Sequence, residues 1–286
     1  MSLSEKLKKH WEKQLNTPRN NLPNWILKKK FFHEHRGNKV PRITGSGKLF
    51  HHLQMEGEEE QIQYDLSVTF FVKQGDTFYH EEEQRVHQAI FRKGKLIKDE
   101  EVNVQEYENS MPTIEPIDRN ALVDTRFSYD RRVAVRYAER WWNDYNPAYR
   151  DFDVDCTNYV SQCLHAGGAP MRGAPNRSNG WWYNDANWSY SWAVAHALRW
   201  YLSGSNSGLQ GKEVENPEEL SLGDVICYDF EGDGRWNHNT IVVAKDQEGM
   251  PLVNAHTTNS RHRYWSYEDS YAWKTDTKYK FFKIGE

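Results

Sequence analysis

Apolar residues follow two different spacings in the first third of the chain. In residues 3–16, Leu7, Trp11 and Leu15 recur every four positions and opposite charges lie close together, which predicts an amphipathic helix. In residues 62–104, apolar and polar positions alternate, and the sequences QGD and RKGK interrupt the alternation where turns are expected. We therefore predict an antiparallel meander of three or four strands with a polar outer face.

Helical spacing returns in the second half of the chain. It predicts one helix over residues 128–146 and a second over 156–166, where two glycines follow directly and favour a stop. The segment 109–121 contains prolines and is typical of a linker. We therefore expect an N-terminal accessory domain over residues 1–118 and a second domain over 119–286.

The last hundred residues combine an aromatic loop with short strands. The loop covers 180–192 and leads into a helix, and strand patterns follow at 225–230, 238–245 and 251–256. The sequence DQEGM between the last two strands predicts a hairpin turn. Helices and antiparallel strands thus occur in both halves, which predicts the α+β class.

Composition excludes several functions. The 286 residues carry a net charge of -4, and the pI is about 6.3, so no basic field favours nucleic acid as a partner. Mean hydropathy is low, at -0.93, but aromatic residues make up 14% and can still supply a core. No apolar run is long enough to cross a membrane, and the N-terminal stretch lacks the apolar region of a secretory signal.

The chain has three cysteines, which is too few for a disulfide framework. Cys156 and Cys163 share one predicted helix and would lie about 10 Å apart, too far to bridge. We expect free thiols and a reducing compartment. The location of the protein is left open between the cytoplasm and the spore or cell wall.

Cys156 occupies the first turn of its predicted helix. The helix dipole and the unsatisfied N–H groups there stabilise a thiolate, and the same N–H groups point to where an oxyanion would form. Asp155 is a good helix cap, although its charge opposes thiolate formation. The alternative interpretation is a buried cysteine that serves packing only.

A cysteine nucleophile needs a base, and two of the twelve histidines stand at strand ends. If the hairpin turn centres near Glu248, then His256 lies opposite Thr240 and diagonal to His238. His238, Thr240, Asn254 and His256 would then share one face of the sheet. This arrangement suits His238 as the base and His256 as the group that orients it, with Asn254 as the second choice.

Several segments resemble one family. The sequences DCTNYVSQCLHAGGAPM, SYSW, LGDVICYDF, HNTIVVA and NAHTTN occur in the order found in the bacterial putative-amidase domain family, which is similar to the NlpC-type and CHAP-type cysteine peptidases. The resemblance covers roughly residues 125–285. It implies a papain-like α+β fold, in which a helix-borne cysteine packs on an antiparallel sheet, and an amidase or peptidase activity that needs no metal or organic cofactor.

The resemblance also implies roles for particular residues. Cys156 would be the nucleophile, His238 the base and His256 the third polar member. Asp155 would hold the substrate amine, unless it only caps the helix. Trp192, in the aromatic loop, and Asn254 complete the expected substrate contacts. The implied substrate is a peptide amide, such as one of the cell wall.

Three other interpretations are open. A zinc site could use Cys156, His238 and His256, although no CxxC or HExxH spacing supports it. A transglutaminase-like enzyme would use the same Cys–His pair, but NAH offers no carboxylate as third member. A catalytically silent papain-like module could bind peptide or glycan with its Trp-rich segments.

Overall fold

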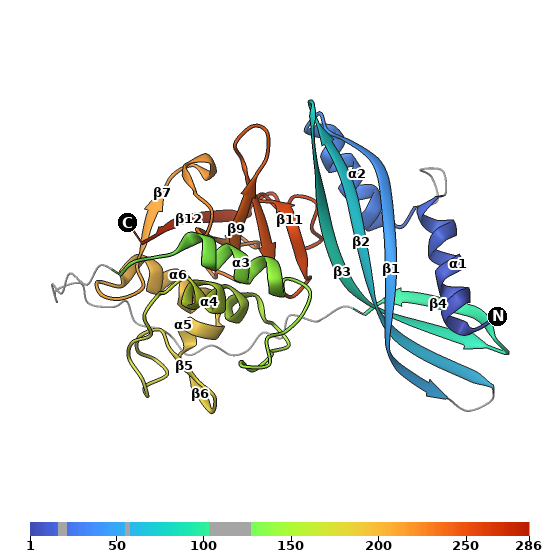
Figure 1. The fold of residues 1–286 in the computed structure, drawn as a ribbon, viewed down its shortest axis with the longest axis horizontal. Helices are drawn as coiled ribbons and strands as arrows, with labels where there is room; N and C mark the ends of the chain where they lie inside the picture. The colour runs from blue at the N-terminus through green and yellow to red at the C-terminus, as the bar shows by residue number, and fades with distance from the viewer. Residues whose placement is uncertain (17–21, 55–57, 103–126, 286) are drawn as a thin grey trace. The chain divides into compact units, whose positions relative to one another are not determined.

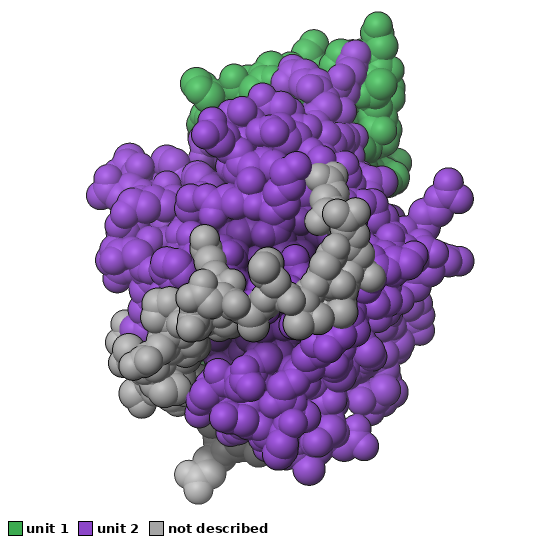
Figure 2. All heavy atoms as spheres, turned by 90° about the vertical axis from the view of Figure 1, so that its left-hand side faces the viewer, with its two compact units in different colours: residues 1–105, 269–271 green, residues 106–268, 272–286 purple. Residues whose placement is uncertain are grey.

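The structure, a computed structural model, describes residues 1–16, 22–54, 58–102 and 127–285. The chain forms two compact units, which Figure 2 colours separately: unit 1 is residues 1–105 with 269–271, and unit 2 is residues 106–268 with 272–286. The expected domain boundary at 118/119 falls outside the described residues and stays a prediction.

Unit 1 is an antiparallel meander with two helices against it (Figure 1). The strands are long, and β2 alternates strictly between buried and half-buried positions, as the sequence predicts for a sheet with one covered face. The buried side chains of both helices join those of β2 and β3 in one apolar core. Its elements are α1 (Leu3–Leu15), α2 (Asn24–His35), β1 (Lys39–Gln54), β2 (Glu59–Gln74), β3 (Thr77–Arg92) and β4 (Lys95–Glu101).

Strand β1 is continuous although it contains a proline and glycines, which usually interrupt a strand. Pro41 lies in an edge strand, within a shift of the β1–β2 ladder between Lys39 and Arg42. Gly45 lies where helix α1 approaches the sheet: a Cβ there would meet Leu15 Cδ1 at 2.8 Å. The glycine therefore admits the helix without ending the strand.

Unit 2 is a six-stranded antiparallel ladder, in the order β11-β10-β9-β8-β12-β7, with short helices. The strands are β7 (Gly211–Val214), β8 (Val225–Asp229), β9 (His238–Lys245), β10 (Pro251–Ala255), β11 (Ser260–Tyr264) and β12 (Lys278–Ile284). The helices are α3 (Arg131–Trp141), α4 (Cys156–Ala166), α5 (Tyr190–Ala193), α6 (Ala195–Gly204) and the 3-10 turn η2 (Pro217–Glu219), and β5 (Tyr183–Asn184) with β6 (Asn187–Trp188) forms a small hairpin.

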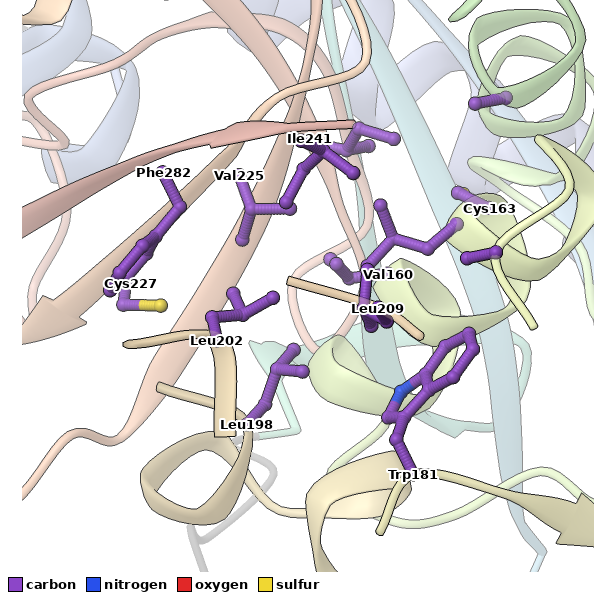
Figure 3. Packing of buried hydrophobic residues seen from close by; sticks show 14 of the residues in the cluster. Val160, Cys163, Trp181, Leu198, Leu202, Leu209, Val225, Cys227, Ile241 and Phe282 are labelled. Carbon is purple, nitrogen blue, oxygen red and sulfur yellow. The ribbon is translucent and has the colours of Figure 1, made fainter. Parts of the chain in front are cut away.

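Each face of the β8–β9 pair belongs to a different core. Val225, Cys227 and Ile241 pack with Val160 and Cys163 of α4 (Figure 3), so we call this the helix-covered face. On the opposite face, the aromatic face, a second set of buried side chains packs together: Ile226, Tyr228, Phe230, Val242 and Tyr267. Alternation along a strand therefore decides which core each side chain enters.

The papain-like α+β fold class is wrong. Antiparallel strands dominate the described residues, four in the ladder of unit 1 and six in that of unit 2, whereas the helices are few and short. Short motifs report local geometry around a few residues, and they do not fix how many strands the rest of the chain adds. No helix among the described residues is long and apolar enough to cross a membrane.

Candidate active site

Cys156 is the first residue of α4, as the sequence predicts, and it is 1% exposed. Asp155 precedes it as the N-cap residue, and Gly167 and Gly168 follow the last turn. The Sγ atom lies 3.7 Å from the hydroxyl of Thr157. The thiol therefore stands at the positive end of the helix dipole, which favours its ionised form.

The Asp155 carboxylate turns away from the helix end. It makes no cap hydrogen bond with its side chain. One oxygen accepts from Phe152 N at 3.1 Å and from Asn158 Nδ2 at 2.8 Å. The other lies 2.7 Å from Nδ1 of His256. Asp155 is thus placed for an ion pair with a histidine, and the expected cap by its side chain is not formed.

His256 uses both ring nitrogens in this arrangement. Its Nε2 lies 2.7 Å from the backbone oxygen of Trp141, which can only accept, so Nε2 carries a proton. Its Nδ1 faces Oδ2 of Asp155 at 2.7 Å, which is the geometry of an ion pair. The ring stacks on Tyr159 of α4 with centroids 4.1 Å apart. His256 therefore compensates the charge of Asp155 and fixes the start of α4.

His238 lies on the aromatic face. Its ring is 5.5 Å from that of Tyr228 and 5.1 Å from that of Tyr267 between centroids. Burial, with a smaller contribution from Arg263, lowers the pKa of His238 to about 3. Its Nε2 is buried and has no hydrogen-bond partner among the described residues.

The register of β9 and β10 explains why His238 and His256 lie on different faces of the sheet. Asn254 pairs with Ile241, because the ladder shifts between Leu252 and Val253. Asn254 and His256 therefore face α3 and α4, whereas His238 and Thr240 face the aromatic core. The predicted shared face of these four residues is wrong, since a shift of one residue exchanges the faces of a strand. It also separates the three ligands that the zinc interpretation requires.

Asn239 of β9, and not its neighbour His238, reaches the turn that holds Cys156. Its Nδ2 donates to the Thr157 hydroxyl at 3.0 Å, beside the candidate nucleophile. Its Oδ1 is buried and has no hydrogen-bond partner in the described part of the chain. The sequence analysis did not identify Asn239. The alternation along β9 identifies it only if the side chains that face α4 are taken to begin at Asn239 and not at His238.

The expected substrate contacts Trp192 and Asn254 are buried inside the fold. Trp192 is fully buried, and its Nε1 donates to Asn158 Oδ1 at 2.8 Å. Asn254 donates to Glu139 Oε1 at 3.0 Å and accepts from His262 N at 2.9 Å. Asn158 is also completely buried.

The fold and the site together define a protein of mainly antiparallel sheet, with a buried cysteine at the start of a helix. An aspartate and a histidine pair with each other at that helix start. The chain belongs to the family described as Putative amidase domain, whose model matches residues 128–282. This family places the protein among the amide hydrolases at the level of class. No solved structure matches the chain.

Two proteins of Bacillus subtilis (strain 168) are similar to the chain. One is "Uncharacterized protein YhbB", which is 47% identical over 254 residues, covering 86% of this chain and 82% of the relative. The other is "Uncharacterized protein YjcM", which is 32% identical over 142 residues, covering 46% of this chain and 31% of the relative. The first similarity therefore extends well beyond the family match, into unit 1.

Proposed function

We propose that the protein hydrolyses amide bonds with Cys156 as the nucleophile. The observation that carries this proposal is the position of the Cys156 thiol at the first residue of α4, beside a carboxylate that His256 compensates. A compensated carboxylate no longer opposes the ionisation of the thiol. The family assignment supplies the bond type.

The reaction consists of two acyl-transfer steps. Sγ of Cys156 attacks the amide carbon, the C–N bond breaks, and the amine leaves with a proton. Water then attacks the thioester, which gives a carboxylic acid and restores the thiol. Backbone N–H groups of the first turn of α4 are the proposed donors to the oxyanion.

The base that we propose is His238, on the strength of the family resemblance and of its unpartnered Nε2. Because His238 faces the aromatic core, proton transfer requires its ring to move past the end of β9 toward α4. His256 is a positioning residue in this scheme, acting through Asp155. A peptide amide, including one of the cell wall, is the proposed substrate, and it rests on the resemblance to NlpC-type and CHAP-type enzymes.

Alkylation of the full chain with iodoacetamide between pH 4 and 9, followed by peptide mapping, tests the nucleophile. Burial raises the pKa of Cys163 and of Cys227, so both serve as internal controls that stay slow. We expect Cys156 to react at pH 6 roughly a hundredfold faster than an ordinary thiol, since only the thiolate reacts. A rate equal to that of a free thiol would remove the basis of the proposal.

Trapping the acyl-enzyme tests the chemistry itself. Peptide amides are incubated with the protein, and its intact mass is followed for a thioester adduct. We expect the adduct with the natural sequence and with Cys163→Ala, and none with Cys156→Ala. His238→Ala should slow both its formation and the alkylation at pH 6; unchanged rates would assign the base elsewhere.

A further inference from the structure

Thr157 follows the candidate nucleophile in α4, and the proposed reaction does not use it. The residue is 1% exposed and lies in the first turn of the helix. Its hydroxyl oxygen has two hydrogen-bond partners among the described residues: Sγ of Cys156 at 3.7 Å and Nδ2 of Asn239 at 3.0 Å. A threonine hydroxyl carries a single proton, so the direction of these two contacts decides how it acts on the thiol.

The amide of Asn239 fixes the first direction. Its Nδ2 can only donate, so the Thr157 oxygen accepts this hydrogen bond and keeps its own proton for another partner. In the described part of the chain, that partner is Sγ of Cys156. If the thiol donated to the hydroxyl instead, the hydroxyl proton would stay buried and unpaired, which is costly.

Burial keeps this arrangement away from water. Asn239 is fully buried, and it pairs with Cys227 of β8 on the helix-covered face of the sheet. A hydrogen bond in such a place does not compete with solvent, and its effect on a charge is larger than at the surface. The strand therefore presents the amide to the first turn of α4 in a fixed position.

The length of the contact with Cys156 fits a hydrogen bond that strengthens on ionisation. A neutral thiol is a weak acceptor, which agrees with an O···S distance of 3.7 Å. A thiolate is a much better acceptor, because hydrogen bonds to charged groups are shorter and stronger. A donor that binds the charged form more tightly favours that form.

We propose that the Thr157 hydroxyl donates a hydrogen bond to the Cys156 thiolate, and that Asn239 turns the hydroxyl toward the sulfur. Thr157 then touches the reacting atom, whereas Asn239 is a positioning residue that acts through Thr157. The inference rests on the proposed function, because this hydrogen bond serves catalysis only if Cys156 is the nucleophile. It adds a side-chain donor to the stabilisation that the helix dipole supplies.

Alkylation of Cys156 by iodoacetamide against pH, in the full chain, measures this hydrogen bond. Thr157→Val keeps the shape of the side chain and removes the donor, so we expect the pKa of Cys156 to rise by about one unit. Thr157→Ser keeps a hydroxyl and should retain the natural value. Thr240→Val is the matched control, because this threonine is as deeply buried but contacts Tyr228 on the aromatic face. It should leave the pKa of Cys156 unchanged.

Asn239→Leu tests the direction of the hydrogen bond. Without the amide donor, the Thr157 hydroxyl is free to turn, so the pKa of Cys156 should rise by less than in Thr157→Val. Because Asn239 acts through Thr157, the double variant should match Thr157→Val alone. A fall in the pKa of Cys156 would mean that the hydroxyl donates to the amide, and it would overturn the proposal.

The outcomes separate this hydrogen bond from the nucleophile itself. If Thr157→Val does not fold, Thr157→Ala removes the same donor and suits a helix. An unchanged pKa of Cys156 in the folded variant would overturn the hydrogen bond, even where the natural sequence reacts as a thiolate. Conversely, an ordinary pKa in the natural sequence would contradict Cys156 as the nucleophile, whereas a further rise in Thr157→Val would still support the hydrogen bond. Asp155 and His256 are present in every variant, so their charges do not enter the comparison.

Discussion

Removing Asp155 and removing His256 should change the ionisation of the Cys156 thiol by different amounts, although the two residues form one pair. Both side chains are almost fully buried, and 2.7 Å separates Oδ2 from Nδ1. Without His256, a buried carboxylate would stand uncompensated next to the thiol. With an amide in place of the carboxylate, no buried negative charge stands next to the thiol. The consequence for the thiol therefore depends on which residue is removed.

We predict that His256→Ala raises the pKa of Cys156 by about 1–2 units, the size expected for an uncompensated buried carboxylate on the neighbouring residue. Asp155→Asn should move it by less than about half a unit. The double variant should restore the value of Asp155→Asn. The rate of iodoacetamide alkylation against pH measures all three, and equal shifts in the two single variants would contradict the compensation argument.

His238 makes a separate prediction about acid stability. Its pKa falls from 6.5 in the unfolded chain to about 3 in the folded protein, because burial disfavours its charged form. The unfolded state therefore binds a proton more readily below pH 6.5, and stability is lost as the pH falls. Between pH 7 and pH 5 this single group costs about 2 kcal/mol.

His238→Phe should flatten that loss, because phenylalanine suits the aromatic face and does not titrate. Urea denaturation at pH 7 and pH 5 measures the difference. His10 and His196, whose pKa values burial also lowers, are present in both proteins. A loss as steep in the variant as in the natural sequence would show that His238 does not titrate as its burial requires.

At the scale of elements, the sequence predicts local structure well and the relation between strands poorly. The helix that begins at Cys156 and the strand at His238 start where the pattern places them. The face of each side chain does not follow, because it depends on a ladder shift between Leu252 and Val253 that leaves no trace in the alternation. The candidate nucleophile was therefore predictable, and its geometric relation to His238 was not.

Helix α3 shows how a single side chain can join several elements. Glu139 Oε1 accepts from Asn254 Nδ2 of β10 at 3.0 Å, and Oε2 accepts from Arg261 Nε of β11 at 2.7 Å. Burial raises the pKa of Glu139, but the hydrogen bonds from His262 and Arg261 outweigh it, and the pKa lies below its usual value. This carboxylate therefore stabilises the packing of α3 on the two strands.

We predict that Glu139→Gln lowers the free energy of unfolding by about 1–3 kcal/mol at pH 7, as for other half-buried charged hydrogen bonds. The contribution is present above the unfolded pKa of 4.5 and disappears as the pH falls through the lower folded value. The two denaturation curves should therefore converge toward acid pH. Arg136→Gln, on an exposed position of α3, is the control, and a constant difference would argue against the carboxylate.

At the scale of the whole molecule, the main surprise is that unit 1 is not continuous in the chain. It includes Asp269, whose carboxylate lies 2.7 Å from Nζ of Lys29. The same ammonium contacts the carboxylates of Glu81 and Glu83, and all these side chains are buried. No pattern in residues 1–118 indicates that Asp269 contributes a third carboxylate, so the sequence could not predict this cluster.

Lys29 decides the sign of the pH dependence of unit 1. Burial raises the pKa of Glu81, but Lys29 and His33 lower it by a larger amount, so its folded value lies below 4.5. In the natural sequence this carboxylate therefore stabilises the unit above pH 4.5, and the stabilisation is lost on acidification. Lys29→Met removes the central cation and leaves buried carboxylates, whose pKa values must rise. A raised carboxyl pKa has the opposite effect: stability is greatest in acid and falls as the pH increases.

We therefore predict that Lys29→Met destabilises unit 1 by about 3–5 kcal/mol at pH 7, the usual cost of an uncompensated buried charge. The loss should shrink toward pH 4, where the carboxylates of the variant take up protons. Chemical denaturation between pH 4 and pH 8, followed by hydrogen exchange in β2 and β3, measures both effects. Lys30→Met, the next residue of α2 and only half-buried, is the control. If the curves of the variant and the natural sequence run parallel, then Lys29 does not hold the three carboxylates in their charged form.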